Sequence, residues 1–174
     1  GWIWKEPGDF CGVHRPGRRQ GVECQDNGEE VVMRIESAER RDLEDIAALL
    51  EQVGLPPLHL EEHLGQFLVA WQDGRICGCV GMEIYGDSCL LRSLAVALDC
   101  QGQGIGRRLV EEITERGREI GMRRGVILTN SAAGFAARFG FVEVSRCAID
   151  GPIGDSWEFR AHACDSAVCM ELQF

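Results

Sequence analysis

The sequence predicts an α/β (α+β) fold in which a mixed central sheet of six to seven strands is flanked by helices. Residues 66–96 contain three strand-like segments joined by two tight turns, which is typical of an antiparallel meander. A glycine-rich turn then leads into an amphipathic helix, and this helix leads into an apolar segment at 126–129. A strand reached through a helix usually lies parallel to the strand before it, so the sheet is expected to be mixed.

Composition divides the chain at residue 33. Residues 1–32 are rich in glycine and proline without a sustained period, so we expect an N-terminal extension, a leader or a disordered arm. Residues 33–174 are expected to form a single domain, because 174 residues with 45% hydrophobic composition can bury one core. Met33 directly precedes the regular pattern, and we interpret it as the natural start or close to it. The alternative is a genuine arm that packs on the domain or on a partner chain through Trp2, Trp4 and Phe10. The intact mass of the native protein separates the two.

The first part of the domain reads as a strand at 31–35 followed by helices. Apolar residues recur at helical spacing from Leu43 to Val53. Gly54 and the two prolines after it predict the end of that helix. A short helix at 58–64 precedes the meander, whose strands are expected at 66–71, 75–85 and 89–96.

The second half alternates helices and strands. Ile105, Leu109, Ile113 and Ile120 are expected on one face of a helix that Gly121 ends. We then expect a strand at 126–129, a small helix at 132–139, a strand at 141–148, a short helical or irregular piece at 156–164 and a closing strand at 167–174.

The charge balance argues against some partners. Lys and Arg number 18 against 28 Asp and Glu, a net charge of −10. Nucleic-acid binding needs clustered basic residues, so neither nucleic acid nor an anionic membrane is expected as a partner. No apolar run has the length of a membrane-spanning helix, and the start lacks a signal-peptide pattern, so we expect a cytoplasmic protein.

Nine cysteines are many for this length. None has C-x-x-C spacing, and Cys77 and Cys79 should share one face of a strand. We interpret the cysteines as buried thiols in a reducing compartment, and we expect no metal. A metal or metalloid site, or a redox pair, is the alternative.

The glycine-rich turn at 101–107 is the segment whose pattern points to chemistry. A strand ends, glycines follow at 102, 104 and 106, and a helix begins. The glycines indicate that backbone approaches another group closely, and the first amides of the helix lack intrahelical partners. Such a turn suits a pyrophosphate. The alternative is glycine used only for turn geometry. The spacing is neither G-x-G-x-x-G nor a P-loop, so Rossmann and kinase interpretations are disfavoured.

This segment resembles a known family. QGQGIG at 101–106 is similar to the Q/R-x-x-G-x-G/A motif of the GNAT (Gcn5-related) N-acetyltransferases, LRSLAV at 91–96 resembles the strand before it, and FGFV at 139–142 resembles a late signature. The element order agrees from 33 to 174. The resemblance implies the GNAT fold, in which two neighbouring strands splay apart and acetyl-coenzyme A inserts between them.

The resemblance also implies site residues. Residues implied to bind the coenzyme are Leu94, Ala95, Val96, Gln101, Gly102, Gln103, Gly104, Ile105, Gly106, Arg107, Asn130, Phe135 and Arg138. An amide near Leu94 would stabilise the oxyanion as an amine attacks the thioester. Our candidate for the base that deprotonates the amine is Glu83, and its alternative is a solvent-facing strand residue.

The sequence indicates the residues that bind the acceptor amine less clearly than those that bind the coenzyme. Arg92 and Ser93 lie just before the thioester end, and Arg92 could pair with an acceptor carboxylate; the alternative is an exposed arginine bridging to a neighbouring glutamate. Many family members place a tyrosine where this chain has Ala136. The only tyrosine is Tyr85, so the residue that protonates the leaving thiolate is unassigned.

Further segments, including 128–135, 157–159, Cys164 and 166–170, resemble amino-acid N-acetyltransferases and acetyltransferases encoded beside arsenic-resistance genes. We therefore expect transfer of acetyl to a small, amino-acid-like primary amine, with a possible arsenic-resistance link. The alternatives are a protein N-terminal or lysine acetyltransferase and a coenzyme-binding regulatory module without turnover. A homodimer is expected from the resemblance, with the closing strand at its interface.

Overall fold

A computed structural model describes residues 33–161 and 166–174. Seven strands form one sheet in the order β1-β2-β3-β4-β5-β7-β6. They are β1 (Arg34–Ser37), β2 (Phe67–Gln72), β3 (Arg75–Tyr85), β4 (Ser88–Val96), β5 (Arg124–Thr129), β6 (Val142–Glu143) and β7 (Val168–Gln173). All neighbours are antiparallel except β4 and β5. The mixed sheet and the parallel pair are as predicted. The expected extension at 1–32 and Cys164 lie outside the described residues.

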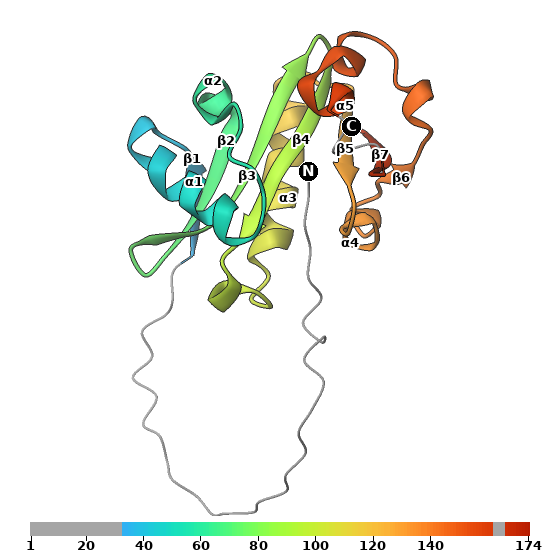
Figure 1. The fold of residues 1–174 in the computed structure, drawn as a ribbon. Helices are drawn as coiled ribbons and strands as arrows, with labels where there is room; N and C mark the ends of the chain where they lie inside the picture. The colour runs from blue at the N-terminus through green and yellow to red at the C-terminus, as the bar shows by residue number, and fades with distance from the viewer. Residues whose placement is uncertain (1–32, 162–165) are drawn as a thin grey trace, which may run out of the picture.

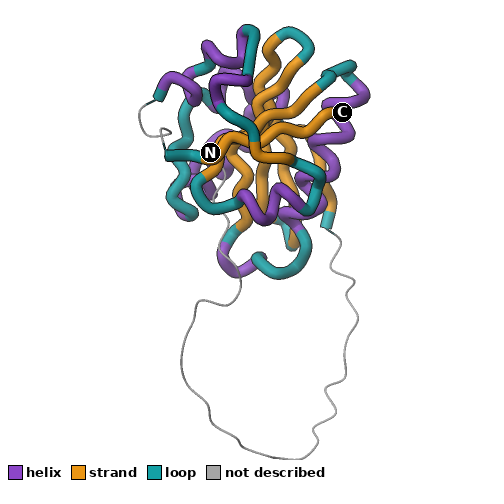
Figure 2. The backbone as a smooth tube through the Cα atoms, turned by 90° about the vertical axis from the view of Figure 1, so that its right-hand side faces the viewer, coloured by secondary structure: helices purple, strands orange, loops and turns teal. Residues whose placement is uncertain are grey.

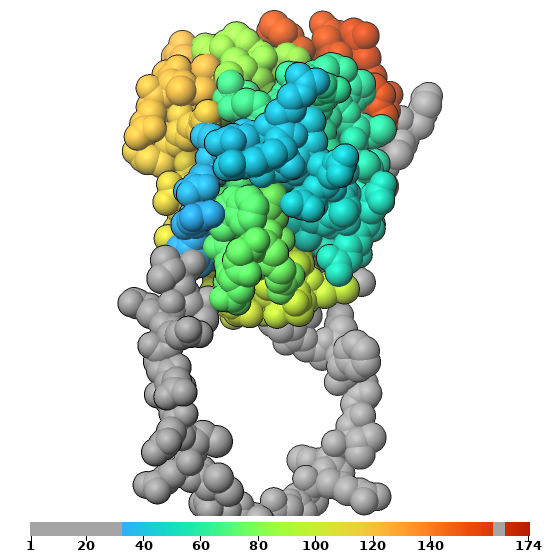
Figure 3. Space-filling model, turned by 90° about the vertical axis from the view of Figure 1, so that its left-hand side faces the viewer, coloured from blue at the N-terminus to red at the C-terminus, as the bar shows by residue number. Residues whose placement is uncertain are grey.

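Helices lie on both sides of the sheet (Figure 1, Figure 2). They are α1 (Leu43–Gln52), α2 (Leu60–His63), α3 (Ile105–Glu119), α4 (Ala133–Ala137) and α5 (Trp157–Arg160). Figure 3 views the face on which α1 and the segment around α2 lie, with residues near 150–160 at its upper edge. The rings of His59 and Trp157, 5.8 Å apart, join these two segments although almost a hundred positions separate them.

The meander turns where the local chemistry requires it. Asp73 and Gly74 both have left-handed backbone, with φ of 52° and 77°. This is the geometry of a two-residue hairpin turn that matches the twist of its strands. The following hairpin turns at Gly86, where φ is 67°. The strands of the meander are therefore set by short-range sequence.

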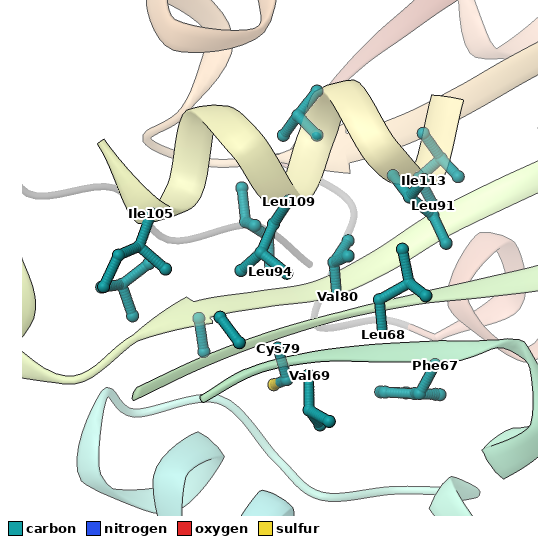
Figure 4. Packing of buried hydrophobic residues seen from close by; sticks show 14 of the residues in the cluster. Phe67, Leu68, Val69, Cys79, Val80, Leu91, Leu94, Ile105, Leu109 and Ile113 are labelled. Carbon is teal, nitrogen blue, oxygen red and sulfur yellow. The ribbon is translucent and has the colours of Figure 1, made fainter. Parts of the chain in front are cut away.

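The principal core lies between α3 and the meander. Ile105, Leu109 and Ile113 point from α3 toward Val80 and Leu94 of the strands (Figure 4). All five side chains are at least 97% buried. Close approach also requires a glycine in β3, because a Cβ at Gly78 would lie 2.9 Å from Leu109 Cδ1. The amphipathic pattern of α3 thus determines the face of the sheet that it covers.

Two sequence predictions about the second half of the chain are wrong. The strand expected at 141–148 is only Val142–Glu143, and a 3-10 turn follows at Arg146–Ala148. There the Arg146 guanidinium donates to the Phe159 carbonyl at 2.7 Å and lies over the Phe159 ring, so the chain leaves the sheet. Ile120 follows the last turn of α3 and is 44% exposed, beyond the part of the helix that packs on the sheet.

The closing strand β7 lies between β5 and β6. Along one edge β5 pairs with all of β7, and along the other β6 pairs only with Met170 and Glu171.

Candidate functional site

The parallel pair β4 and β5 is joined at one end only. Ser88–Leu90 pair with Arg124–Val126 in register, and the pairing stops there. The remainder of each strand, 91–96 and 127–129, therefore has no partner across this gap. Backbone groups on that edge of β4 are left to pair with something other than β5. This is the splayed pair that the fold class predicted.

A bulge interrupts β4 where it has separated from β5. Cys79 pairs with Ala95 and Gly81 pairs with Arg92, so Val80 faces two residues, Ser93 and Leu94. Ser93 has a φ of 55°, in the left-handed region that a non-glycine residue seldom adopts. A bulge leaves one residue outside the ladder and changes the direction of the groups that follow it. The irregularity involves Ser93, which the sequence placed just before the thioester end, and Leu94, near which the resemblance implied the oxyanion donor.

The glycine turn after β4 needs glycine for its backbone angles. Gly102 and Gly104 have φ of 80° and 82°, and a Cβ added at either would meet no atom within 4 Å. Gly104 is the N-cap of α3, and its carbonyl accepts from the Arg108 amide at 3.1 Å. At these two positions the conformation of the chain, and not a close protein contact, explains the residue type. The amides before Arg108 face outward from the first turn of α3.

Side-chain hydrogen bonds also hold this turn in place. The Gln101 side-chain amide donates to the Val96 carbonyl at 3.1 Å, which closes the loop onto the end of β4. Arg75 at the start of β3 donates to Asp99 at 2.5 Å and to Cys100 Sγ at 3.2 Å. The conformation of the turn is therefore held by the neighbouring hairpin as well as by its own glycines.

A hollow of about 360 Å³ lies between the turn and α4. Thr129 orients α4, because its Oγ1 accepts from the amides of Ser131 and Ala132 at 3.3 and 2.8 Å. Phe135 contacts Phe139 edge-on, with ring centroids 5.1 Å apart. The hollow is lined by the sequence-predicted residues Val96, Gln101, Gly102, Gly104, Ile105, Gly106, Arg107, Phe135 and Arg138, together with Cys100, Glu111 and Phe139, which were not predicted.

Four other predicted residues do not line this hollow. Leu94 and Ala95 are buried in β4. Gln103 is exposed, and its side chain accepts from Gln72 at 3.1 Å. Asn130 is exposed at the end of β5 and accepts from the Ser166 hydroxyl at 3.4 Å.

A second polar centre, built from side chains, lies on the sheet surface opposite α3. Glu83 of β3 and Arg92 of β4 are hydrogen-bonded through Oε1 and Nη1. Their side chains are 5% and 4% exposed. Glu158 of α5 places Oε1 3.7 Å from Arg92 Nε, and it is equally buried. We call Glu83, Arg92 and Glu158 the buried ionic cluster.

Neighbouring segments complete the surroundings of the buried ionic cluster. Arg92 Nη2 donates to the Leu58 carbonyl at 2.8 Å, and Nε donates to Ser93 Oγ at 3.3 Å. His63 of α2 places Nε2 3.7 Å from Glu83 Oε1. The expected alternatives of a solvent-facing Glu83 and an exposed Arg92 are therefore wrong. Each guanidinium nitrogen of Arg92 has a protein partner, so an acceptor carboxylate would have to displace one of them.

The protonation state of Glu83 follows from its contacts. Burial alone would raise its pKa, but the hydrogen bond from Tyr85 at 2.6 Å and the bond and charge of Arg92 outweigh burial. The pKa of Glu83 therefore lies below its ordinary value. Burial, and then the bond to Glu83, raises the pKa of Tyr85 far above its usual range. Glu83 is thus an anion and Tyr85 a neutral donor at neutral pH.

Sequence reasoning assigned no role here to Glu158 of the buried ionic cluster, or to His63 and Tyr85, which contact Glu83. Each comes from a different element, so no local motif contains them. The available signals were a polar residue at the end of an apolar strand for Tyr85 and the resemblance at 157–159 for Glu158, and neither indicates that these groups meet. Ala136, where many GNAT proteins have a tyrosine, is fully buried in α4, and the alanine side chain has no group that could protonate a thiolate.

The six cysteines within the described ranges are free, and five of them are buried, as predicted. Burial raises the pKa of Cys79, Cys89 and Cys100 to about 12. Among residues 33–161 and 166–174, no three His, Cys, Asp or Glu side chains converge as a metal site would require.

Comparison with known proteins agrees with this architecture. Residues 63–143, slightly under half of the chain, match the model of the acetyltransferase (GNAT) domain. An amino-acid acetyltransferase of Neisseria meningitidis is 31% identical over 126 residues, which are 67% of this chain and 29% of that protein. The chain therefore spans under a third of the length of this relative.

Solved structures are similar over most of the chain. N-acetylglutamate synthase from Neisseria gonorrhoeae, complexed with coenzyme A and L-arginine, has a TM-score of 0.71 at 25% identity, over 83% of this chain and 34% of that one. The Rv2747 protein of Mycobacterium tuberculosis, in complex with CoA, has a TM-score of 0.69 at 21% identity, over 80% of this chain and 98% of that one, which is a likeness of fold. Among the helices described here, none is long and apolar enough to cross a bilayer.

Proposed function

This chain contains an acetyltransferase domain of the GNAT family, and we propose that it is an acetyl-coenzyme A-dependent N-acetyltransferase acting on a small, amino-acid-like primary amine. The observation that carries the proposal is the hollow where the glycine turn faces Phe135 and Arg138, next to the unpaired edge of β4. Backbone amides at a helix N-terminus favour an anion, and an unpaired strand edge favours an extended amide chain. Coenzyme A has both features.

The residues fit the coenzyme in three places. The amides of the turn from Gln101 to Arg107 would hold the pyrophosphate, although the net charge of the chain is −10. The free edge of Leu94, Ala95 and Val96 would pair with the pantetheine amides. Asn130, Phe135 and Arg138 would flank its far end.

The acetyl thioester supplies an activated carbonyl for direct attack by the amine. The amide of Leu94, within the bulge, is the proposed donor to the oxyanion that forms. A preorganised donor of this kind commonly contributes about 10²–10³ in rate. The strained φ of Ser93 is consistent with this use, because such conformations often occur where an amide must be aimed.

The proposed acceptor class rests on the relatives. The relative from N. meningitidis is named an amino-acid acetyltransferase. Arg92 contributes by holding the Leu58 carbonyl and Glu83 in place, and it would bind an acceptor carboxylate only after exchanging one of these partners. The cytoplasmic location and the homodimer remain expectations, which fractionation and sedimentation can test.

The test is acetyl transfer by the purified chain to a panel of amino acids, arsenic-containing amino acids, polyamines, aminoglycosides and basic peptides. Products are measured by mass spectrometry, because the exposed Cys147 would react with a thiol reagent. Transfer to one or a few amino acids is expected. Transfer to peptides alone would identify a protein acetyltransferase, and coenzyme A binding without any product would contradict enzymatic activity.

A further inference from the structure

Glu83, the base candidate from the sequence, is poorly suited to accept the proton of an ammonium substrate. Glu83 is buried, bonded to Arg92 and Tyr85, and held as an anion with a lowered pKa. A carboxylate with a lowered pKa is a weak base. Tyr85 stays protonated, because burial and Glu83 raise its pKa. These contacts leave the base of the proposed reaction unassigned among the residues singled out from sequence.

His63 is an ionisable group at the exposed side of this cluster. Its side chain is 31% exposed, whereas those of Glu83 and Arg92 are 5% and 4% exposed. Imidazole is the side chain whose ordinary pKa lies nearest to neutrality. His63 ends α2, which lies beside β3 (Figure 1). It can therefore contact both solvent and the cluster.

The position of His63 is set by two contacts of its segment. The Leu58 carbonyl accepts from Arg92, and His63 Nε2 lies 3.7 Å from Glu83 Oε1. That distance is an ion-pair distance and longer than a hydrogen bond. Arg92 also donates to Ser93 at the bulge, so the same guanidinium connects the α2 segment to the strand proposed to hold the thioester.

We propose that His63 is the general base of this acetyl transfer and that Glu83 positions it. This inference rests on the proposed function. Glu83 faces Nε2, so its charge favours the tautomer with a proton on Nε2 and a lone pair on Nδ1. The same charge stabilises the imidazolium once the proton arrives. A base oriented by a buried carboxylate is a recurring catalytic arrangement.

The proton balance is as follows. Nδ1 of His63 takes one proton from the acceptor R–NH3⁺. The resulting R–NH2 attacks the acetyl carbon, so that the C–N bond forms and the C–S bond breaks with its electron pair on sulfur. The second proton of the nitrogen goes to the departing thiolate, and the imidazolium returns its proton to solvent. The products are R–NH–acetyl, coenzyme A as the thiol, and one proton.

The charged groups around His63 determine the expected pH dependence. Glu83 of β3 faces it directly, and Arg92 of β4 lies behind Glu83. Glu62, the neighbour of His63 in α2, contacts His59 at 3.3 Å. Protonation of His63 removes its lone pair, so activity falls on the acid side of the pH profile.

The test is a pH profile of kcat and kcat/KM for the full chain and for His63→Asn, His63→Ala and Glu83→Gln, with the acceptor that the wild type uses best. His59→Asn is the matched control, because it removes a histidine four positions earlier in the same segment. Its left-handed φ of 55° suits asparagine. Binding of coenzyme A, measured by calorimetry, reports on folding separately.

We expect His63→Asn to lower kcat by about 10² or more, a usual contribution of a general base. The acid limb should disappear, while coenzyme A affinity stays within about threefold, since the turn is untouched. Free imidazole should raise the rate of His63→Ala but not that of the wild type. Glu83→Gln should lower kcat and keep the acid limb, since His63 remains the base but is no longer positioned by the carboxylate.

Two outcomes separate the proposals. A wild-type chain that binds coenzyme A but transfers no acetyl group overturns the proposed function and this inference with it. An active wild type matched by His63→Asn in kcat and in the acid limb overturns the role of His63 alone. If His63→Asn fails to bind coenzyme A, the imidazole response of His63→Ala decides, and the absence of that response overturns the inference.

Discussion

The glycine turn and the buried ionic cluster lie at the two sides of the proposed reaction, and they are built in opposite ways. The turn is one continuous segment, 101–107, whose backbone lines an open hollow. The buried ionic cluster joins side chains from β3, β4 and α5, each 5% exposed or less. A backbone site tolerates side-chain changes that keep its φ angles, whereas a buried set of charges depends on every member.

Of the proposed changes, removing Arg92 should reduce the stability of the chain most. A small loss would contradict the view that the buried ionic cluster depends on every member. Arg92→Ala leaves Glu83 and Glu158 buried without their cation, so we expect a loss of about 3–5 kcal/mol in the free energy of unfolding. Denaturant unfolding measures it. The matched triple variant Glu83→Gln/Arg92→Met/Glu158→Gln, which removes all three charges, should recover most of that loss.

A loss below about 1 kcal/mol for Arg92→Ala would mean that the cluster is hydrated and behaves like a surface ion pair.

Replacing Gly104 tests the role of the glycine turn. Alanine at φ of 82° costs about 1–2 kcal/mol, and it also perturbs the amides that face the hollow. Gly104→Ala should therefore weaken coenzyme A binding by about tenfold or more. Gly121→Ala is the matched control, because Gly121 follows the other end of α3 with the same φ of 82° and also has open space around a Cβ.

The two glycine variants should lose similar stability and differ in calorimetric affinity for coenzyme A. Equal affinity in both would show that the turn needs glycine only for folding.

The smallest expected effect is the acid dependence of stability. The pKa of Glu83 is lower in the folded chain than in the unfolded one. Its contribution is therefore present above the ordinary carboxyl pKa of about 4.3, and is lost as pH falls through the folded value. As the pH is lowered through that range, the free energy of unfolding of Glu83→Gln should decrease less steeply than that of the wild type. An unchanged slope would indicate that other carboxylates account for the acid limb.

The sequence predicted a strand correctly where the residue pattern of that strand alone determines its bounds. The strand expected at 75–85 coincides with β3, and its turn at Asp73–Gly74 has the backbone that those residue types favour. The strand expected at 141–148 was wrong because Arg146 bonds to the Phe159 carbonyl, a contact with a distant segment. Local pattern contains no information on such a contact.

The sequence by itself determined the order of elements, the left-handed glycines of the turn and the apolar face of α3, because each depends on residues within one or two turns of chain. Only the tertiary structure decided that Glu83 is an anion held by Arg92, and that His63 and Glu158 join it. These groups belong to four elements, and their charges interact only after folding has excluded water. The bulge at Ser93 was also decided in three dimensions, since it depends on the register of β4 against β3.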